Sequence, residues 1–348
     1  MADDRTASTR LEVVEVSMSG GDMMEIEEVD PGVLDLCSRQ LKDLTKIVLK
    51  DHLTEVDLTA NRFTSIDPRV LALPKLENLS LRQNLVADAT PLCGMANVAG
   101  FKRVVLHDNH LKALPPLDGF PALEVLDVGY NEVRSMAPVA GLDGKNLVEL
   151  TLAANKIGKI EGVEHLTHLD MLELGSNRLR VIEGLETQTQ LQELWLGRNK
   201  ISEVGGLGTL ANLRRISLQS NRLTSMRGLE ACTLLEELYL SHNAISRLEG
   251  VAPLSRLQVL DVSSNKVAVI EDLEGHEALT DLWLNDNQIA SFDNLEKELR
   301  GSREVLTTVY LHNNPAVAKL GGAEEYKARV LLALPNLTQL DWMTNPKP

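Results

Sequence analysis

The sequence predicts an α/β solenoid, in which about 12–13 short repeats stack and each adds one strand to a parallel sheet. Two observations predict this class. Asparagine recurs at a nearly constant interval, and seven of the eleven successive spacings are 22 residues. The residues around each asparagine repeat one pattern, L-x-x-L-x-L-x-x-N-x-L, with Val, Ile or Phe replacing some leucines. The repeating asparagines are Asn61, Asn84, Asn109, Asn131, Asn155, Asn177, Asn199, Asn221, Asn243, Asn265, Asn287 and Asn314.

This pattern is the leucine-rich-repeat signature, so the strands are expected to line a concave face above one continuous leucine core. A degenerate copy precedes the first asparagine and consists of Leu34, Leu36, Leu41 and Leu44, with Arg39 in the asparagine position. The asparagine itself comes at the turn that leaves the strand. Its side-chain amide both donates and accepts hydrogen bonds, so we assign it a structural role and no binding role.

The second half of each repeat forms the convex side. A repeat of 22 residues leaves no room for a long helix there, so 3₁₀ turns or extended segments are expected. The 25-residue and 24-residue repeats, around residues 92–99 and 141–146, are expected to carry slightly longer convex turns.

The repeats are predicted to occupy residues 31–315 and to be closed by a C-terminal cap over residues 316–348. Residues 323–337 begin with an acidic turn, continue with apolar residues at helical spacing and end at Pro335, which predicts a helix. Trp342 is expected to pack on the last repeat. Residues 1–30 are acidic and interrupted by Gly and Ser, which predicts a mostly disordered tail.

Within that tail, Met23, Met24 and Ile26 are apolar enough to dock on the first repeat as a partial cap. The N-terminal sequence has no apolar stretch typical of a secretory signal, and no run approaches a membrane span. We therefore expect the protein to be located in the nucleus and the cytoplasm.

The composition excludes several classes of function. A formal net charge of −15 disfavours nucleic acid and anionic membranes as partners. Three widely spaced cysteines predict neither a disulfide framework nor a metal site. Phosphate loops and hydrolase or metalloprotease motifs are not found. His107 with Asp108 is the nearest approach to an acid–base pair, and it lacks a nucleophile. We predict no catalytic residue, cofactor or metal.

The concave face carries an unusual set of residues. Side chains alternate along a strand, so positions 3, 5 and 7 of the pattern face the concavity. The chain has three Trp, four Tyr and four Phe, and four of these aromatics occupy position 5, where chance would place fewer than one. In chain order position 5 is Asp35, Asp57, Ser80, Val105, Asp127, Thr151, Glu173, Trp195, Ser217, Tyr239, Asp261, Trp283 and Tyr310.

Aromatic rings among acidic residues are typical of a protein-binding hot spot. Position 3 adds further acids, so the partner is expected to present Lys or Arg, with charge setting orientation and the rings supplying affinity. The alternative is cross-strand stacking that merely covers the sheet. We prefer binding, because polar residues in the intervening repeats are expected to prevent a continuous stack.

Several segments resemble one family closely. They are the I-E-G-L/V motifs at residues 160–163 and 182–185, DLWLNDNQI at 281–289, TVYLHNNP at 308–315, and the cap sequence YKARVLLALPNLTQLD at 326–341. Over residues 30–348 the chain resembles the leucine-rich-repeat regulatory subunits of protein phosphatase-1, the regulatory subunit 7 family.

The resemblance implies a non-catalytic protein that binds the phosphatase catalytic subunit through the concave face and controls its activity, maturation or availability. A further inhibitory subunit is implied in a ternary complex. Thr151 departs from the family, which has an aromatic residue there. We add Tyr239 from the concave pattern itself. The family's contact residues match Asp127, Glu173, Trp195, Asp261, Asp281, Trp283 and Tyr310.

Two other functions stay open. A leucine-rich-repeat scaffold for ciliary or cytoskeletal assembly would use the same face for a different target. An acidic nuclear histone-binding module would predict a long acidic tail, which the C-terminal sequence DWMTNPKP does not provide.

Overall fold

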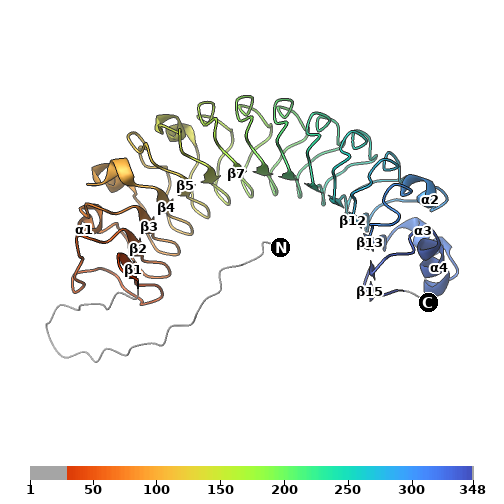
Figure 1. Ribbon diagram of the computed structural model, residues 1–348, viewed down its shortest axis with the longest axis horizontal. Coiled ribbons are helices and arrows are strands. Elements are labelled where there is room, and N and C mark those ends of the chain that lie inside the picture. Colours follow the sequence, from red (N-terminus) through yellow and green to blue (C-terminus); the bar gives the residue numbers. More distant parts are fainter. Residues whose placement is uncertain (1–29, 347–348) are drawn as a thin grey trace.

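The computed structural model describes residues 30–346, which form a curved solenoid with a β-sheet along its inner edge (Figure 1). In this part of the chain a single sheet of 15 strands runs in sequence order from β1 to β15. The predicted fold class is confirmed. Apart from Asp30, the tail predicted over residues 1–30, with Met23, Met24 and Ile26, lies outside the described residues.

Every repeat copy contributes one strand of three residues, from position 3 to position 5 of the pattern. Neighbouring strands are parallel and pair identical positions, as in Leu194 with Ile216. The strands are β1 (Val33–Asp35), β2 (Glu55–Asp57), β3 (Asn78–Ser80), β4 (Arg103–Val105), β5 (Val125–Asp127), β6 (Glu149–Thr151), β7 (Met171–Glu173), β8 (Glu193–Trp195), β9 (Arg215–Ser217), β10 (Glu237–Tyr239), β11 (Val259–Asp261), β12 (Asp281–Trp283) and β13 (Thr308–Tyr310).

The core is one column of aliphatic side chains that passes through all the repeats. In a typical repeat Leu191, Leu194, Leu196 and Ile201 are all fully buried. Each such side chain contributes roughly 1.5–3 kcal/mol when it is removed from water. Because a single repeat cannot bury these residues by itself, stability comes from stacking on the neighbouring repeats.

The asparagines have the expected structural role. Asn199 donates from Nδ2 to the carbonyls of Leu174 and Leu196, at 2.9 and 3.0 Å, and accepts from the Leu179 N–H at 3.0 Å. The preceding residue, Arg198, has φ 56°, and each of the other repeating asparagines is likewise preceded by a residue with positive φ. This left-handed conformation is unfavourable for a side chain other than glycine. The asparagine side chain therefore stabilises a strained turn.

The convex side consists mainly of turns and extended chain, as expected. In the 25-residue repeat, two 3₁₀ helices lie at the two ends of the predicted longer turn at residues 92–99. In the 24-residue repeat a 3₁₀ helix ends at Gly141, the first residue of the other predicted longer turn. The convex helices are α1 (Pro68–Leu71), η1 (Thr90–Gly94), η2 (Val98–Gly100), η3 (Ala137–Gly141) and α2 (Leu295–Glu298).

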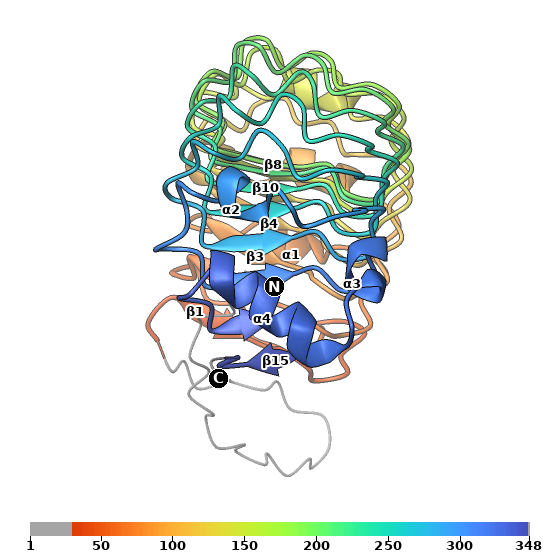
Figure 2. The same ribbon diagram turned by 90° about the vertical axis from the view of Figure 1, so that its right-hand side faces the viewer.

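The C-terminal end of the solenoid is covered by α3 (Pro315–Lys319), α4 (Ala323–Ala333) and two short strands, β14 (Gln339–Leu340) and β15 (Met343–Thr344), as Figure 2 shows. β14 pairs parallel with β13, whereas β15 pairs antiparallel with β14. The α4 residues Tyr326 and Val330 are buried against the last repeats. No helix in the described part of the chain is long and apolar enough to cross a bilayer.

Candidate functional site

Position 5 forms one row of side chains across the concave side of the sheet, because the strands pair without any shift in register. Seven of the eight residues predicted from the sequence to bind a partner lie in this row. The eighth, Asp281, lies on the same face two residues before Trp283. The seven are Asp127, Glu173, Trp195, Tyr239, Asp261, Trp283 and Tyr310. We call Trp195, Tyr239, Trp283 and Tyr310 the aromatic row.

The aromatic row is continuous, which corrects the expectation that polar residues interrupt it. Centroids of consecutive rings are 6.4, 6.5 and 5.9 Å apart along the row. The first two contacts pass over the intervening Ser217 and Asp261, which are 3% and 4% exposed. Strands lie about 4.8 Å apart, so large rings on alternate strands meet when the residue between them is small. All four rings are consequently half-buried rather than fully exposed.

The row continues beyond the last repeat onto the cap. Tyr310 contacts His312, and His312 contacts Trp342, with ring centroids 6.3 and 5.7 Å apart. Trp342 thus contacts the last repeat, as expected, through the ring of His312, but at 75% exposure it is not packed into the end of the solenoid. The reason is the preceding residue, Asp341, whose φ of 51° ends β14 and turns Trp342 outward. Asp341 is buried and accepts a 2.7 Å hydrogen bond from the hydroxyl of Tyr326, which fixes this turn.

Two rings of the row are held by carboxylates on their own strands. The indole Nε1 of Trp195 donates to Glu193 at 3.1 Å, and the hydroxyl of Tyr239 donates to Glu237 at 2.7 Å. Arg215, on the strand between them, donates to Glu193 at 2.6 Å and to Glu237 at 3.0 Å. Burial, followed by the bond to Glu237, raises the pKa of Tyr239. The phenol therefore stays protonated and remains a donor at physiological pH.

Trp283 lacks an equivalent bond. Its Nε1 is buried and has no hydrogen-bond partner among the described residues. The acid two residues before it is Asp281, which is one methylene shorter than glutamate and accepts instead from the hydroxyl of Thr280 at 2.7 Å. A buried unpaired donor is costly. Within the aromatic row, this donor is the one buried polar atom that the described part of the protein leaves unsatisfied.

The aspartates of position 5 have a local structural role. Asp127 accepts from the N–H of Gly129, and Asp261 accepts from the N–H of Ser263, both at 2.9 Å. Short acidic side chains commonly close a turn by this bond to the second following residue. Because Asp261 is only 4% exposed, its carboxylate is not available at the surface, in contrast to its predicted contact role.

The N-terminal half of the concave face carries a second group of titratable residues. Nδ1 of His107 lies 3.2 Å from Oδ2 of Asp127 in the next repeat. The histidine therefore pairs with Asp127 rather than with Asp108, the partner that the sequence indicated. Glu173 is half-buried in the same row, and its pKa is raised by burial and by the charge of Asp127. Thr151, between these two acids, is 6% exposed and offers little surface.

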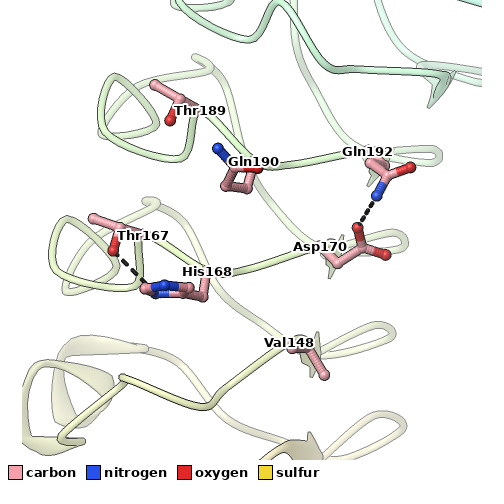
Figure 3. A pocket seen from close by; sticks show the side chains of 7 residues that line it. All are labelled: Val148, Thr167, His168, Asp170, Thr189, Gln190 and Gln192. Atoms are coloured by element: carbon pink, nitrogen blue, oxygen red, sulfur yellow. Dashed lines mark hydrogen bonds between the residues drawn. The ribbon is translucent and has the colours of Figure 1, made fainter.

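An open hollow of about 740 Å³ lies beside β7 and β8, outside the concave row (Figure 3). The hollow is wide open to solvent, and most of the residues that line it are polar. Two side-chain hydrogen bonds, Thr167–His168 and Gln192–Asp170, lie along its wall. Among the described residues no group of three or more His, Cys, Asp or Glu side chains could hold a metal ion. The hollow is lined by Val148, Thr167, His168, Asp170, Thr189, Gln190 and Gln192.

Sequence reasoning missed the side chains that hold the aromatic row. Position 3 reads Glu193, Arg215 and Glu237 in three consecutive repeats. Opposite charges at paired positions of neighbouring strands attract each other, so this alternation was the available signal. Nothing in the pattern signalled Trp342, because its exposure depends on the backbone conformation of Asp341.

Comparison with known proteins supports this architecture. The family described as "Leucine Rich repeats (2 copies)" matches residues 189–231, 211–255 and 255–297, and that described as "Leucine rich repeat" matches residues 121–179. The internalin inlF of Listeria monocytogenes superimposes with a TM-score of 0.78 at 23% identity, covering 90% of this chain and 88% of that one. The protein LIC12759 of Leptospira interrogans superimposes with a TM-score of 0.68 at 21% identity, covering 92% and 100%. These structures share the fold.

Two plant proteins are similar in sequence. Over 162 residues the chain is 47% identical to the "Protein phosphatase 1 regulatory inhibitor subunit PPP1R7 homolog" of Arabidopsis thaliana, covering 46% of this chain and 49% of that protein. Over 135 residues it is 28% identical to the "187-kDa microtubule-associated protein AIR9" of the same plant, covering 37% and 8%. The matches thus span about half or less of these relatives. The chain has the leucine-rich-repeat fold, and over about half of its length it resembles the PPP1R7 homologue.

Proposed function

We propose that the chain is a non-catalytic regulatory subunit that binds the protein phosphatase 1 catalytic subunit through its acidic and aromatic concave face. Binding would control the activity, maturation or availability of the phosphatase in nucleus and cytoplasm, and a further inhibitory subunit would join a ternary complex. The observation that carries the proposal is the aromatic row, in a chain that is 47% identical over 162 residues to a protein named as a phosphatase 1 regulatory subunit.

The chemistry of the row supports a protein partner. Half-buried rings of Trp and Tyr provide large, rigid contact areas that lose little entropy on binding. Trp283 also has a buried indole N–H that the described residues leave unpaired, and a partner carbonyl or carboxylate would satisfy it. Trp342, at 75% exposure, extends the same surface onto the cap.

The charges around the row favour a partner surface that carries Lys or Arg. Glu193, Glu237 and Asp281 all lie on the concave face beside the rings and are partly exposed. Oppositely charged surfaces orient an encounter and accelerate it, while buried aromatic anchors slow dissociation. The same acids would repel the phosphates of a nucleic acid.

Titration calorimetry with purified phosphatase 1 catalytic subunit tests the proposal. Trp283→Ala is expected to weaken binding by about 2 kcal/mol or more, which corresponds to roughly 30-fold in Kd. Val269→Ala is the matched control, because Val269 is an exposed apolar residue outside the sheet and 51% accessible. Absence of binding by folded wild-type protein, to both metal-loaded and metal-depleted phosphatase, would overturn the proposal.

The match to a microtubule-associated protein favours a second candidate, a scaffold for cytoskeletal or ciliary assembly. Co-sedimentation with microtubules separates the two functions. Wild-type protein that sediments with microtubules and fails to bind the phosphatase would support the scaffold.

A further inference from the structure

A network of charged side chains joins the first two rings of the aromatic row. Glu193, Arg215 and Glu237 are paired positions of the neighbouring strands β8, β9 and β10. Arg215 bonds to Oε1 of both glutamates, at 2.6 and 3.0 Å, and the rings of Trp195 and Tyr239 bond to the two Oε2 atoms, at 3.1 and 2.7 Å. Each carboxylate therefore uses one oxygen for Arg215 and the other for a ring.

This network fixes the orientation of both rings. Trp195 and Tyr239 stack with their planes 22° apart and their centroids 6.4 Å apart, above the small buried side chain of Ser217. A ring contact alone leaves each side chain free to rotate about its χ angles. A hydrogen bond from the polar edge of each ring removes much of that freedom before a partner arrives.

The other half of the row provides an internal comparison. The contacts Tyr239–Trp283 and Trp283–Tyr310 have planes 56° and 82° apart, and Trp283 has no hydrogen bond from its indole nitrogen. Polar anchoring is therefore specific to the pair that lies beside Arg215 rather than a property of every ring in the row.

We propose that Arg215 is a positioning residue of the concave face: by holding Glu193 and Glu237 in place, it pre-orients Trp195 and Tyr239 for the partner. This inference rests on the proposed function. The planar guanidinium suits the role, because it can donate to two carboxylates in a fixed geometry, whereas the ammonium of lysine acts as a single point charge.

If Arg215 acted only through its charge, its removal would strengthen binding, whereas loss of positioning would weaken it. Removal of this cation makes an acidic face more negative, and a partner with basic residues would then associate faster and bind more tightly. Loss of positioning instead accelerates dissociation, because the rings must be ordered within the complex. The direction of the change in affinity thus separates the two roles.

The experiment measures association and dissociation rates with immobilised phosphatase 1 catalytic subunit for wild type, Arg215→Met, Arg215→Lys and Arg247→Met. Arg247 is the matched control, because it also bonds to a glutamate of the next repeat, Glu271, at 2.8 and 2.9 Å, and it lies outside the strands of the concave face. We expect Arg215→Met to dissociate about ten-fold faster. Arg215→Lys should recover part of the loss, and Arg247→Met should dissociate at the wild-type rate.

Near-ultraviolet circular dichroism of the free proteins provides a readout that a change of charge alone would not move. Arg215→Met is expected to lose signal from the Trp195–Tyr239 pair while its far-ultraviolet spectrum stays unchanged. Wild-type affinity or tighter binding by Arg215→Met overturns the inference and leaves the proposed function standing. Failure of the wild type to bind overturns the proposed function, and the inference fails with it.

Discussion

A buried histidine allows one sharp prediction about stability. His276 is fully buried, its Nε2 lies 3.2 Å from the carbonyl of Val251, and its Nδ1 has no partner among the described residues. Burial lowers the pKa of His276. Gln188 occupies the same repeat position and donates from its side-chain nitrogen to the carbonyl of Val163 at 2.6 Å. His276→Gln should therefore keep the hydrogen bond and remove the titrating group.

The sign of the effect follows from the lowered pKa. As pH falls, the unfolded chain takes up a proton on His276 before the folded protein does, so stability present above about pH 6.5 is lost at lower pH. A single proton changes the free energy of unfolding by at most about 1.4 kcal/mol per pH unit. Relative to wild type, His276→Gln should differ by less than about 1 kcal/mol at pH 8 and gain up to about 2 kcal/mol on going to pH 5.

Urea unfolding of both proteins at pH 5, 6, 7 and 8, followed by circular dichroism, measures this difference. The other seven histidines contribute to wild type and variant alike, so they cancel in the comparison. Gln188→His is the reciprocal variant, and it should introduce a matching loss of stability below pH 6.5. A difference between His276→Gln and wild type that stays constant from pH 8 to pH 5 would refute the reasoning.

Three further predictions concern the fold. Leu194→Ala should lower the free energy of urea unfolding by about 2–5 kcal/mol, because Leu194 is fully buried. Trp195→Ala should lower it by less than half as much, because its ring lies on the concave face. Equal losses would contradict the assignment of Leu194 to the core and Trp195 to the concave face. Asn199→Ala leaves the N–H of Leu179 unpaired and should cost about 1–3 kcal/mol in the same assay. Asp341→Ala should release the cap. The Leu311 amide, which donates to Asp341 at 2.7 Å, should then exchange its hydrogen faster in a hydrogen-exchange experiment. Wild-type protection of this amide would exclude the role of Asp341.

Much of the candidate site could be predicted because the repeat is so regular. Once position 4 must enter the core, positions 3 and 5 have to face the concavity, and Trp195 and Trp283 then fall into one row. The orientation of individual side chains could not be predicted in this way. A glutamate two residues before the ring reaches it, as Glu193 reaches Trp195, whereas an aspartate is one methylene shorter and does not. This single methylene explains why Trp195 is hydrogen-bonded and Trp283 is unpaired.

The sequence by itself determined the period, the strands that the repeats contribute, the parallel order of those strands and the residues of the concave row, because each is a local property that every repeat imposes on the next. The two cap strands, β14 and the antiparallel β15, were not predicted. Tertiary structure alone decided how side chains of different repeats meet. The continuous ring contacts form only because Ser217 and Asp261 are small and buried between larger neighbours. Trp342 is exposed because Asp341 adopts a left-handed turn that its bond from Tyr326 holds in place. Such contacts join residues far apart in the chain, and their geometry depends on the curvature of the whole solenoid.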